Sequence, residues 1–153
     1  MANPSWTFRL ASGRSFDQVG ADQARQTAQA FGRQIYKEGL GIMAESQGLV
    51  PVDTSALRSS GYVGEPSIEG NEVQVVLGYG GPAAKINPKT HESTDSYALY
   101  VHENLDAFHK VGTAKYLEMP FDQAKEGMPA RVAAGMRSEK YGGIQDLGNP
   151  EAI

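Results

Sequence analysis

The chain has 153 residues, a length that fits one domain with one modest hydrophobic core. Apolar residues make up 40% and charged residues 21%, the composition of a folded protein rather than of a disordered or membrane-embedded chain. No run approaches the roughly 18 consecutive apolar residues of a membrane span. Cysteine is absent, which excludes disulfides, thiolate nucleophiles and cysteine zinc sites. The first residues lack the pattern of a secretory signal, so we expect a cytoplasmic protein.

The formal net charge is -4, with 14 basic residues scattered among 18 acidic ones. Strong phosphate binding needs clustered lysine and arginine, because release of counterions drives the association. The sequence contains no basic run, so we expect no dedicated DNA-binding surface. A net charge of -4 is still compatible with a surface along which DNA passes without binding.

In chain order, the first predicted element is a strand over residues 5–10, where Trp6, Phe8 and Leu10 alternate with polar residues. Alternation of this kind indicates one buried face. Residues 17–47 then change to helical spacing and predict a long helix, with a bend near Gly39. Its apolar stripe consists of Ala24, Ala28, Phe31, Ile35, Ile42 and Met43.

Gly48 and Pro51 end this helix, and Asp53 is the predicted cap of a short helical turn. Val52 before this cap and Leu57 within the turn are placed as in a hydrophobic staple. Two strands follow, over residues 59–68 and 72–79. The Glu69-Gly70-Asn71 sequence between them predicts a hairpin turn.

The second half of the chain predicts a long exposed loop over residues 80–95, a strand over 96–103 and a connection over 104–112. We expect the strand over 96–103 to share a sheet with the strand around Val73 to Leu77. A helix from about Pro120 to Arg137 is expected to kink or split at Pro129. Residues 138–153 are polar and glycine-rich, which is typical of an extended arm.

Motifs for catalysis are incomplete. The segment from Gly78 to Lys85 resembles a phosphate-binding loop, but Lys85 is not followed by Ser or Thr and a helix. Two His-Glu pairs, at His91 and His102, carry aspartate four residues after the histidine, where a zinc protease has its second histidine. His109 adds a third imidazole. The sequence also has no Gly-x-Ser-x-Gly nucleophile motif.

Two segments, in this order, resemble the small neck proteins of tailed bacteriophages, also called tail-completion, head–tail joining or minor capsid proteins. The first is Val50-Pro51-Val52-Asp53-Thr54-Ser55-Ala56-Leu57-Arg58-Ser59-Ser60, similar to a family signature that often has glycine at the position of Ser55. The second is Tyr97-Ala98-Leu99-Tyr100-Val101-His102-Glu103, continuing from Ala107 through Gly112-Thr113-Ala114-Lys115-Tyr116-Leu117-Glu118-Met119-Pro120. We call these the first and second motif segments. Serine at position 55 suggests that this turn does not need a positive φ.

The resemblance covers residues 17–137 and implies an α+β domain, with a long helix packed on a small, mainly antiparallel sheet. It divides the chain into a neck or tail-completion domain over residues 1–137 and a C-terminal arm over 138–153. It implies a structural virion protein, present in host cytoplasm during assembly, that forms a homo-oligomeric ring joining the DNA-filled head to the tail. Its partners would be other neck, portal or tail proteins, with genome DNA passing through the lumen without specific binding.

The resemblance brings no catalytic residue, metal or cofactor, and it implies a protein that is not an enzyme. His102, Glu103 and His109 are then interpreted as structural groups that form hydrogen bonds near the loop after residue 103. The alternative from another class is a small metal-dependent hydrolase that uses His102, Glu103 and His109. A soluble binding module unrelated to phages is a third hypothesis.

Overall fold

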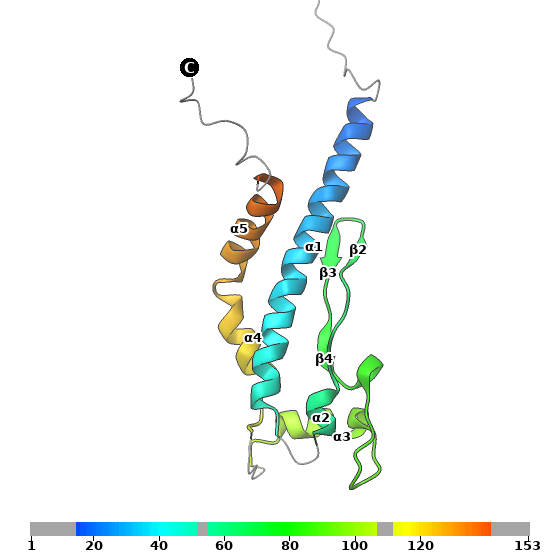
Figure 1. Ribbon diagram of the computed structural model, residues 1–153, viewed down its shortest axis with the longest axis vertical. Coiled ribbons are helices and arrows are strands. Elements are labelled where there is room, and N and C mark those ends of the chain that lie inside the picture. The colour runs from blue at the N-terminus through cyan, green and yellow to red at the C-terminus, as the bar shows by residue number, and fades with distance from the viewer. Residues whose placement is uncertain (1–14, 52–54, 107–111, 142–153) are drawn as a thin grey trace, which may run out of the picture.

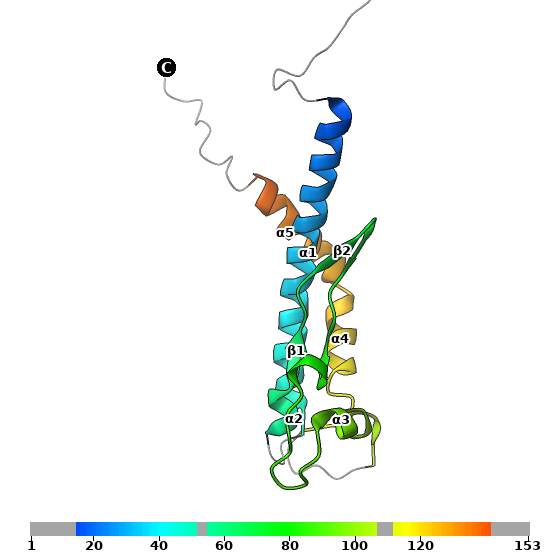
Figure 2. The same ribbon diagram turned by 90° about the vertical axis from the view of Figure 1, so that its right-hand side faces the viewer.

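The computed structural model describes residues 15–51, 55–106 and 112–141. One long helix, α1 (Phe16–Leu49), runs along most of this elongated structure. A β-hairpin lies along one side of α1, the C-terminal helices lie along another, and two short helices, over residues 56–59 and 94–103, lie near its lower end (Figures 1 and 2). The predicted α+β class, with a long N-terminal helix and C-terminal helices, is confirmed. The predicted strand over residues 5–10 lies outside the described residues.

Helix α1 begins and ends where its local sequence provides caps. The Ser15 side chain accepts a hydrogen bond from the Gln18 backbone N–H, and the Gln18 side chain accepts one from the Ser15 backbone N–H. This reciprocal pair satisfies two N–H groups that have no partner within the helix. At the other end, the Val50 N–H donates to the Ser46 carbonyl and Pro51 follows. The helix is continuous through Gly39.

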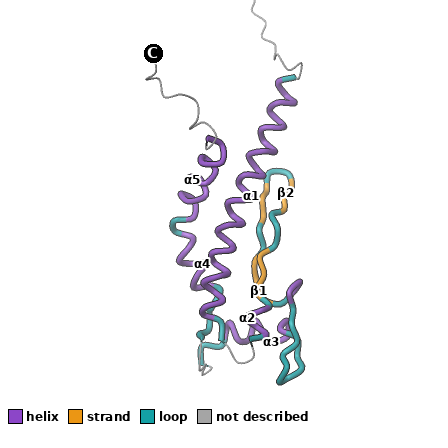
Figure 3. Tube along the Cα trace, in the orientation of Figure 1, coloured by secondary structure: helices purple, strands orange, loops and turns teal. Residues whose placement is uncertain are grey.

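The hairpin comprises β1 (Gly61–Val63), β2 (Ser67–Glu69), β3 (Glu72–Gln74) and β4 (Leu77–Tyr79). β2 pairs with β3 and β1 with β4, both antiparallel, so the predicted hairpin is confirmed as two short ladders (Figure 3). The turn uses Gly70 at φ 58.

Glycines on α1 let the hairpin lie close to the helix. A Cβ atom at Gly32 would come within 3.0 Å of Pro66, and one at Gly39 within 3.1 Å of Val63. These two glycines are seven residues apart, about two helical turns, so they present one face of α1 to the hairpin.

The predicted strand over residues 96–103 is wrong, because this segment forms helix α3 (Thr94–Glu103). Ser93 caps the helix by accepting a hydrogen bond from the Asp95 N–H. Thr94 and Ala98, one helical turn apart, are buried, whereas Leu99 is 73% exposed. The expectation that this segment shares a sheet with Val73 to Leu77 is therefore also wrong. The preceding loop contains a short 3-10 turn, η1 (Gly81–Ala83), and one isolated bridge between Ile86 and Ser93.

The turn before helix α2 (Ala56–Ser59) also differs from the prediction. Ser55 has φ 62, in the left-handed region, and its side chain makes no capping hydrogen bond. Serine thus adopts the conformation that glycine accommodates without strain, and the inference that this turn needs no positive φ is wrong. The predicted cap Asp53 and its neighbour Val52 lie outside the described residues.

The C-terminal helix is split, as predicted, into α4 (Glu118–Lys125) and α5 (Met128–Tyr141). Pro129 lies in the first turn of α5, where a missing N–H costs no helical hydrogen bond. Residues 138–141 of the predicted arm continue α5, and residues 142–153 lie outside the described part.

Two ion pairs join α5 to α1. Arg131 lies 2.6 Å from Glu38, and Arg33 lies 2.7 Å from Glu139. The order of these partners shows that α5 runs antiparallel to α1. We refer to these two ion pairs as the α1–α5 clasp.

The buried core lies at the lower end of α1. Besides Ile42, Met43 and Val132, the buried residues include a cluster of Val50, Leu57, Ala98 and Tyr116, packed by Leu49, Tyr79, Tyr97, Val101 and Leu117. Apart from Leu49 and Tyr79, the residues of this cluster belong to the two motif segments. The segments that carry the family resemblance are therefore brought together as one packed unit.

Candidate functional site

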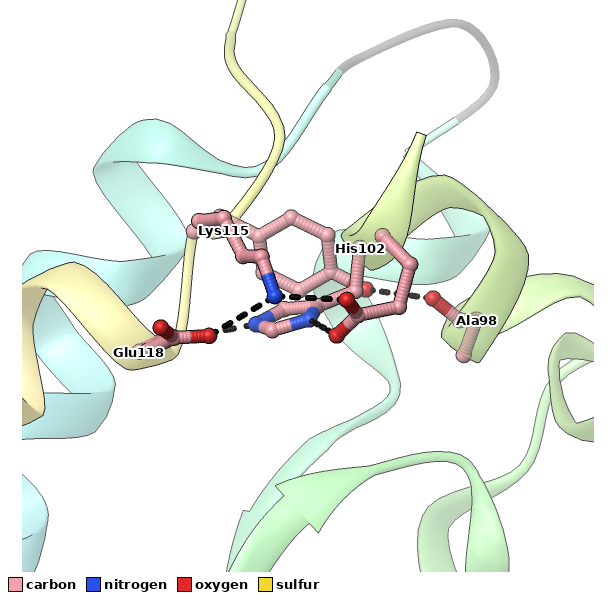
Figure 4. A network of polar contacts seen from close by, with 6 residues as sticks. Ala98, His102, Lys115 and Glu118 are labelled. Atoms are coloured by element: carbon pink, nitrogen blue, oxygen red, sulfur yellow. Dashed lines mark hydrogen bonds and ion pairs between the residues drawn. The ribbon is translucent and has the colours of Figure 1, made fainter. Parts of the chain in front are cut away.

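A polar cluster joins the end of α3 to the start of α4 beside this core (Figure 4). It consists of His102 and Glu103 in the last turn of α3, Lys115 in the connection, and Glu118 at the first position of α4. We call these four residues the Lys115 cluster. The Lys115 backbone N–H donates a 2.8 Å hydrogen bond to the His102 carbonyl, which holds the connection against α3. Residues of the second motif segment that are far apart in sequence thus meet here.

Both ring nitrogens of His102 have partners. Nδ1 lies 2.7 Å from Oε1 of Glu103, and Nε2 lies 3.4 Å from the backbone N of Glu118. Because the Glu118 N–H is a donor, Nε2 acts as the acceptor and Nδ1 carries the proton that is donated to Glu103. The hydrogen bonds therefore give Nδ1 the donor role and Nε2 the acceptor role.

Lys115 bridges the two carboxylates of the cluster. Its Nζ lies 2.5 Å from Oε2 of Glu103 and 2.9 Å from Oε2 of Glu118. The hydrogen bond from Lys115 lowers the pKa of Glu103, with a smaller contribution from His102. The same bond raises the pKa of Lys115, assisted by Glu118. The ammonium and the Glu103 carboxylate are both charged at neutral pH.

Two tyrosines support the cluster from the core. The Tyr116 ring packs edge-on against His102, with ring centroids 5.0 Å apart, and edge-on against Tyr79 at 5.1 Å. Burial raises the pKa of Tyr116 well above its usual range. Burial also raises the pKa of Tyr79, although its hydrogen bond with Ser46 opposes the shift. Both phenols stay protonated at neutral pH and act as packing and hydrogen-bonding groups.

Three groups of the cluster have the donor types of a metal site. Donor atoms of His102, Glu103 and Glu118 lie within 4.8 Å of one another. However, the Lys115 ammonium already bridges both carboxylates, and both His102 nitrogens are engaged in hydrogen bonds. A divalent cation would have to displace Lys115 and break the histidine contacts. The arrangement therefore favours an internal ion-pair network over a metal site.

The hydrolase alternative requires His102, Glu103 and His109 together. The structure joins His102 to Glu103, and His109 lies outside the described residues. His91 is exposed in the 80–95 loop, with φ 60, and is not among the residues of the cluster. Sequence reasoning gave no role to Lys115 or Glu118. Their spacing, three residues apart at a helix start, was the available signal for an ion pair.

Gly112 connects the cluster to the first motif segment. It has φ 97, and a Cβ atom there would lie 2.5 Å from the Pro51 Cα atom. The next residue, Thr113, donates a 2.8 Å backbone hydrogen bond to the Leu49 carbonyl. Only glycine fits this close approach between the end of α1 and the connection.

An apolar hollow of about 300 Å³ lies beside the cluster, lined mainly by Leu77, Leu117 and Phe121. His102 and Glu118 form its polar edge. Phe121 is 46% exposed, so the hollow opens to the surface.

No family model, curated protein or solved structure matches this chain. Within residues 15–51, 55–106 and 112–141, the helices are too short or too polar to cross a bilayer.

Proposed function

We propose that this chain is a structural virion protein of a tailed phage, a subunit of a homo-oligomeric ring in the neck or tail-completion region. The observation that carries the proposal is the packing of the two motif segments into one core. Val50 and Leu57 come from the first segment, and Ala98 and Tyr116 from the second. Residues of both segments thus share one buried cluster.

The same end of the molecule presents apolar side chains on its outside. Leu99 and Tyr100 on α3 are 73% and 68% exposed, and Leu105 after the helix is 73% exposed. Exposed apolar side chains of this size are candidates for contact with another protein. A ring offers each subunit a neighbour with the same complementary surface at every step. We assign these three residues to the contact between subunits.

A structural role also accounts for the Lys115 cluster. The Lys115 ammonium pairs with the Glu103 and Glu118 carboxylates, and both ring nitrogens of His102 are engaged in hydrogen bonds. The cluster stabilises the connection between α3 and α4. The protein in this proposal is not an enzyme, and its partners are other neck, portal or tail proteins. Residues 142–153 would add contacts to neighbours, and genome DNA would pass through the lumen.

The proposal is tested first on purified protein. We expect closed rings with a central channel by electron microscopy, and a mass in solution that is a multiple of the protomer mass. Leu99→Asp combined with Leu105→Asp should abolish the rings and leave a folded monomer. Ser96→Asp, which adds a charge at another exposed position of α3, is the matched control and should still assemble.

The second test is genetic. Inactivation of the gene in its phage should give DNA-filled heads and tails that remain separate, and wild-type protein should restore joining. A wild-type protein that stays monomeric at all concentrations, together with normal particles from the inactivated phage, would refute the proposal. Hydrolytic activity lost in His102→Ala would instead support the metal-dependent hydrolase.

A further inference from the structure

A long groove runs along the N-terminal half of α1, beside the tip of the hairpin. It has a volume of about 950 Å³ and is mainly apolar. Ala24, Ala28 and Phe31 line it from α1, and Ile68 and Val73 from the hairpin. Phe31 is 37% exposed and Ile68 is 42% exposed. In Figure 1 this region is the upper half of α1, next to β2 and β3.

One sequence feature has the complementary pattern. Fourteen residues precede Ser15, and within them Trp6, Phe8 and Leu10 alternate with polar residues. This pattern predicts an extended segment with one apolar face. Side chains on that face repeat about every 6.6 Å. Ala24 and Ala28 on α1 are one helical turn apart, about 6 Å along the axis, so the two repeats nearly match.

The length of the segment also fits the groove. Phe31 is sixteen residues after Ser15, about 24 Å along α1. Trp6 is nine residues before Ser15, so an extended chain reaches about 30 Å, less what is lost in reversing direction. Gly13, close to the start of α1, supplies the conformational freedom for that reversal. A segment that folds back therefore places Trp6 near Phe31, Phe8 near Ala28 and Leu10 near Ala24.

We propose that residues 5–10 fold back along their own α1 and bury Trp6, Phe8 and Leu10 in this groove. Ile68 and Val73, which form a cross-strand pair of the β2–β3 ladder, are the hairpin side chains that this segment would cover.

Tryptophan fluorescence tests the proposal, because Trp6 is the only tryptophan in the chain. The full-length protein should show a blue-shifted emission that resists acrylamide quenching and does not change on dilution. Ala28→Glu places a charge in the groove and should shift the emission to the red. Gln29→Glu, an exposed neighbour that does not line the groove, should leave the emission unchanged. Circular dichroism checks that both variants keep their helix content.

A second test, by disulfide formation, avoids the charged variant Ala28→Glu and so does not depend on whether that variant folds. The natural chain has no cysteine, so Phe8→Cys with Ala28→Cys introduces one defined pair. Mild oxidation should produce a disulfide within one chain, seen by mass spectrometry and non-reducing gel. Phe8→Cys with Gln29→Cys, as a control, should react much more slowly.

Two results would overturn the proposal. The first is a Trp6 emission equal to that of free tryptophan amide in the wild type and unchanged in Ala28→Glu. The second is a disulfide that links two chains, since this would assign the groove to the segment of a second copy.

Discussion

The hydroxyl group of Tyr116 donates a 2.9 Å hydrogen bond to the carbonyl oxygen of Ala98. Both residues belong to the buried core, so this bond ties the α3–α4 connection to α3 away from water. Its neighbours are the His102 and Tyr79 rings, which both meet Tyr116 edge-on. The bond therefore connects the Lys115 cluster to the packed core.

Removal of this hydroxyl should lower stability. In Tyr116→Phe the ring packing is kept, and the loss of a buried hydrogen bond costs about 1 to 2 kcal/mol. The free energy of unfolding from urea denaturation measures the effect. Tyr100→Phe is the matched control, because its hydroxyl accepts an exposed hydrogen bond from Asn104 that water can replace. Equal losses in the two variants would contradict a special role for Tyr116.

The Lys115 cluster should make stability depend on pH at both extremes. The Glu103 pKa is lowered in the folded state, so its contribution is complete above the ordinary value of 4.5 and is lost as pH falls through the folded pKa. The Lys115 pKa is raised, so its contribution is complete below 10.5 and is lost as pH rises through the folded pKa. The difference in Tm between wild type and Lys115→Met should therefore be largest near neutral pH.

The control for this prediction is Lys125→Met. Lys125 pairs with Asp122 at 2.7 Å on the surface of α4, and both partners are exposed. A single exposed pair contributes little, so its removal should change Tm less than removal of Lys115. Addition of salt should also reduce the Lys115 effect, because exposed ion pairs are screened. A Lys115→Met curve parallel to wild type at every pH would contradict the ion-pair interpretation.

Ser55 offers a stabilising substitution. Its φ of 62 is costly for a residue with a Cβ atom. Ser55→Gly removes this strain, and after the larger entropy loss of glycine the net gain should be about 0.5 to 1 kcal/mol. Ser96→Gly, in the regular helix α3, should instead lose about 0.5 kcal/mol. Chemical denaturation measures the free energy of unfolding, which should rise in Ser55→Gly and fall in Ser96→Gly. A lower free energy of unfolding in Ser55→Gly would show that backbone strain at residue 55 does not limit stability.

Truncation should separate α5 from the residues that follow it. Removal of residues 142–153 should leave Tm nearly unchanged, because the α1–α5 clasp is kept. Removal of residues 138–153 also removes Glu139, the partner of Arg33, and should lower Tm. In the proposed ring, the shorter deletion should still impair the joining of heads to tails. A large loss of Tm in the shorter deletion would show that residues 142–153 belong to the folded core.

Most of the fold could be predicted from local patterns. Helical spacing and caps define α1, and the Gly70-Asn71 turn defines the hairpin. The error over residues 96–103 has a physical cause, since Tyr97, Leu99 and Val101 fit a strand while Thr94, Ala98 and Val101 fit a helix. Ser93 caps the helix that forms, and the prediction did not use this signal.

The candidate site was harder to predict than the fold. Glu103 and His102 are adjacent in sequence, but their cation, Lys115, is twelve residues away across a connection. Its position depends on Gly112, whose close approach to Pro51 is a tertiary contact. No local pattern contains that information. The sequence therefore identified His102 and Glu103 as members of the Lys115 cluster, but not the lysine that pairs with Glu103.

The α1–α5 clasp determines how α5 can move. Arg33 and Glu38 lie about one and a half helical turns apart on α1, and each is paired with a different turn of α5. A slide of α5 by one turn, about 5.4 Å, separates both pairs at once. Both ion pairs oppose a small slide of α5 along α1, whereas a slide of a full turn breaks both of them. The two ion pairs therefore favour one register of α5 on α1.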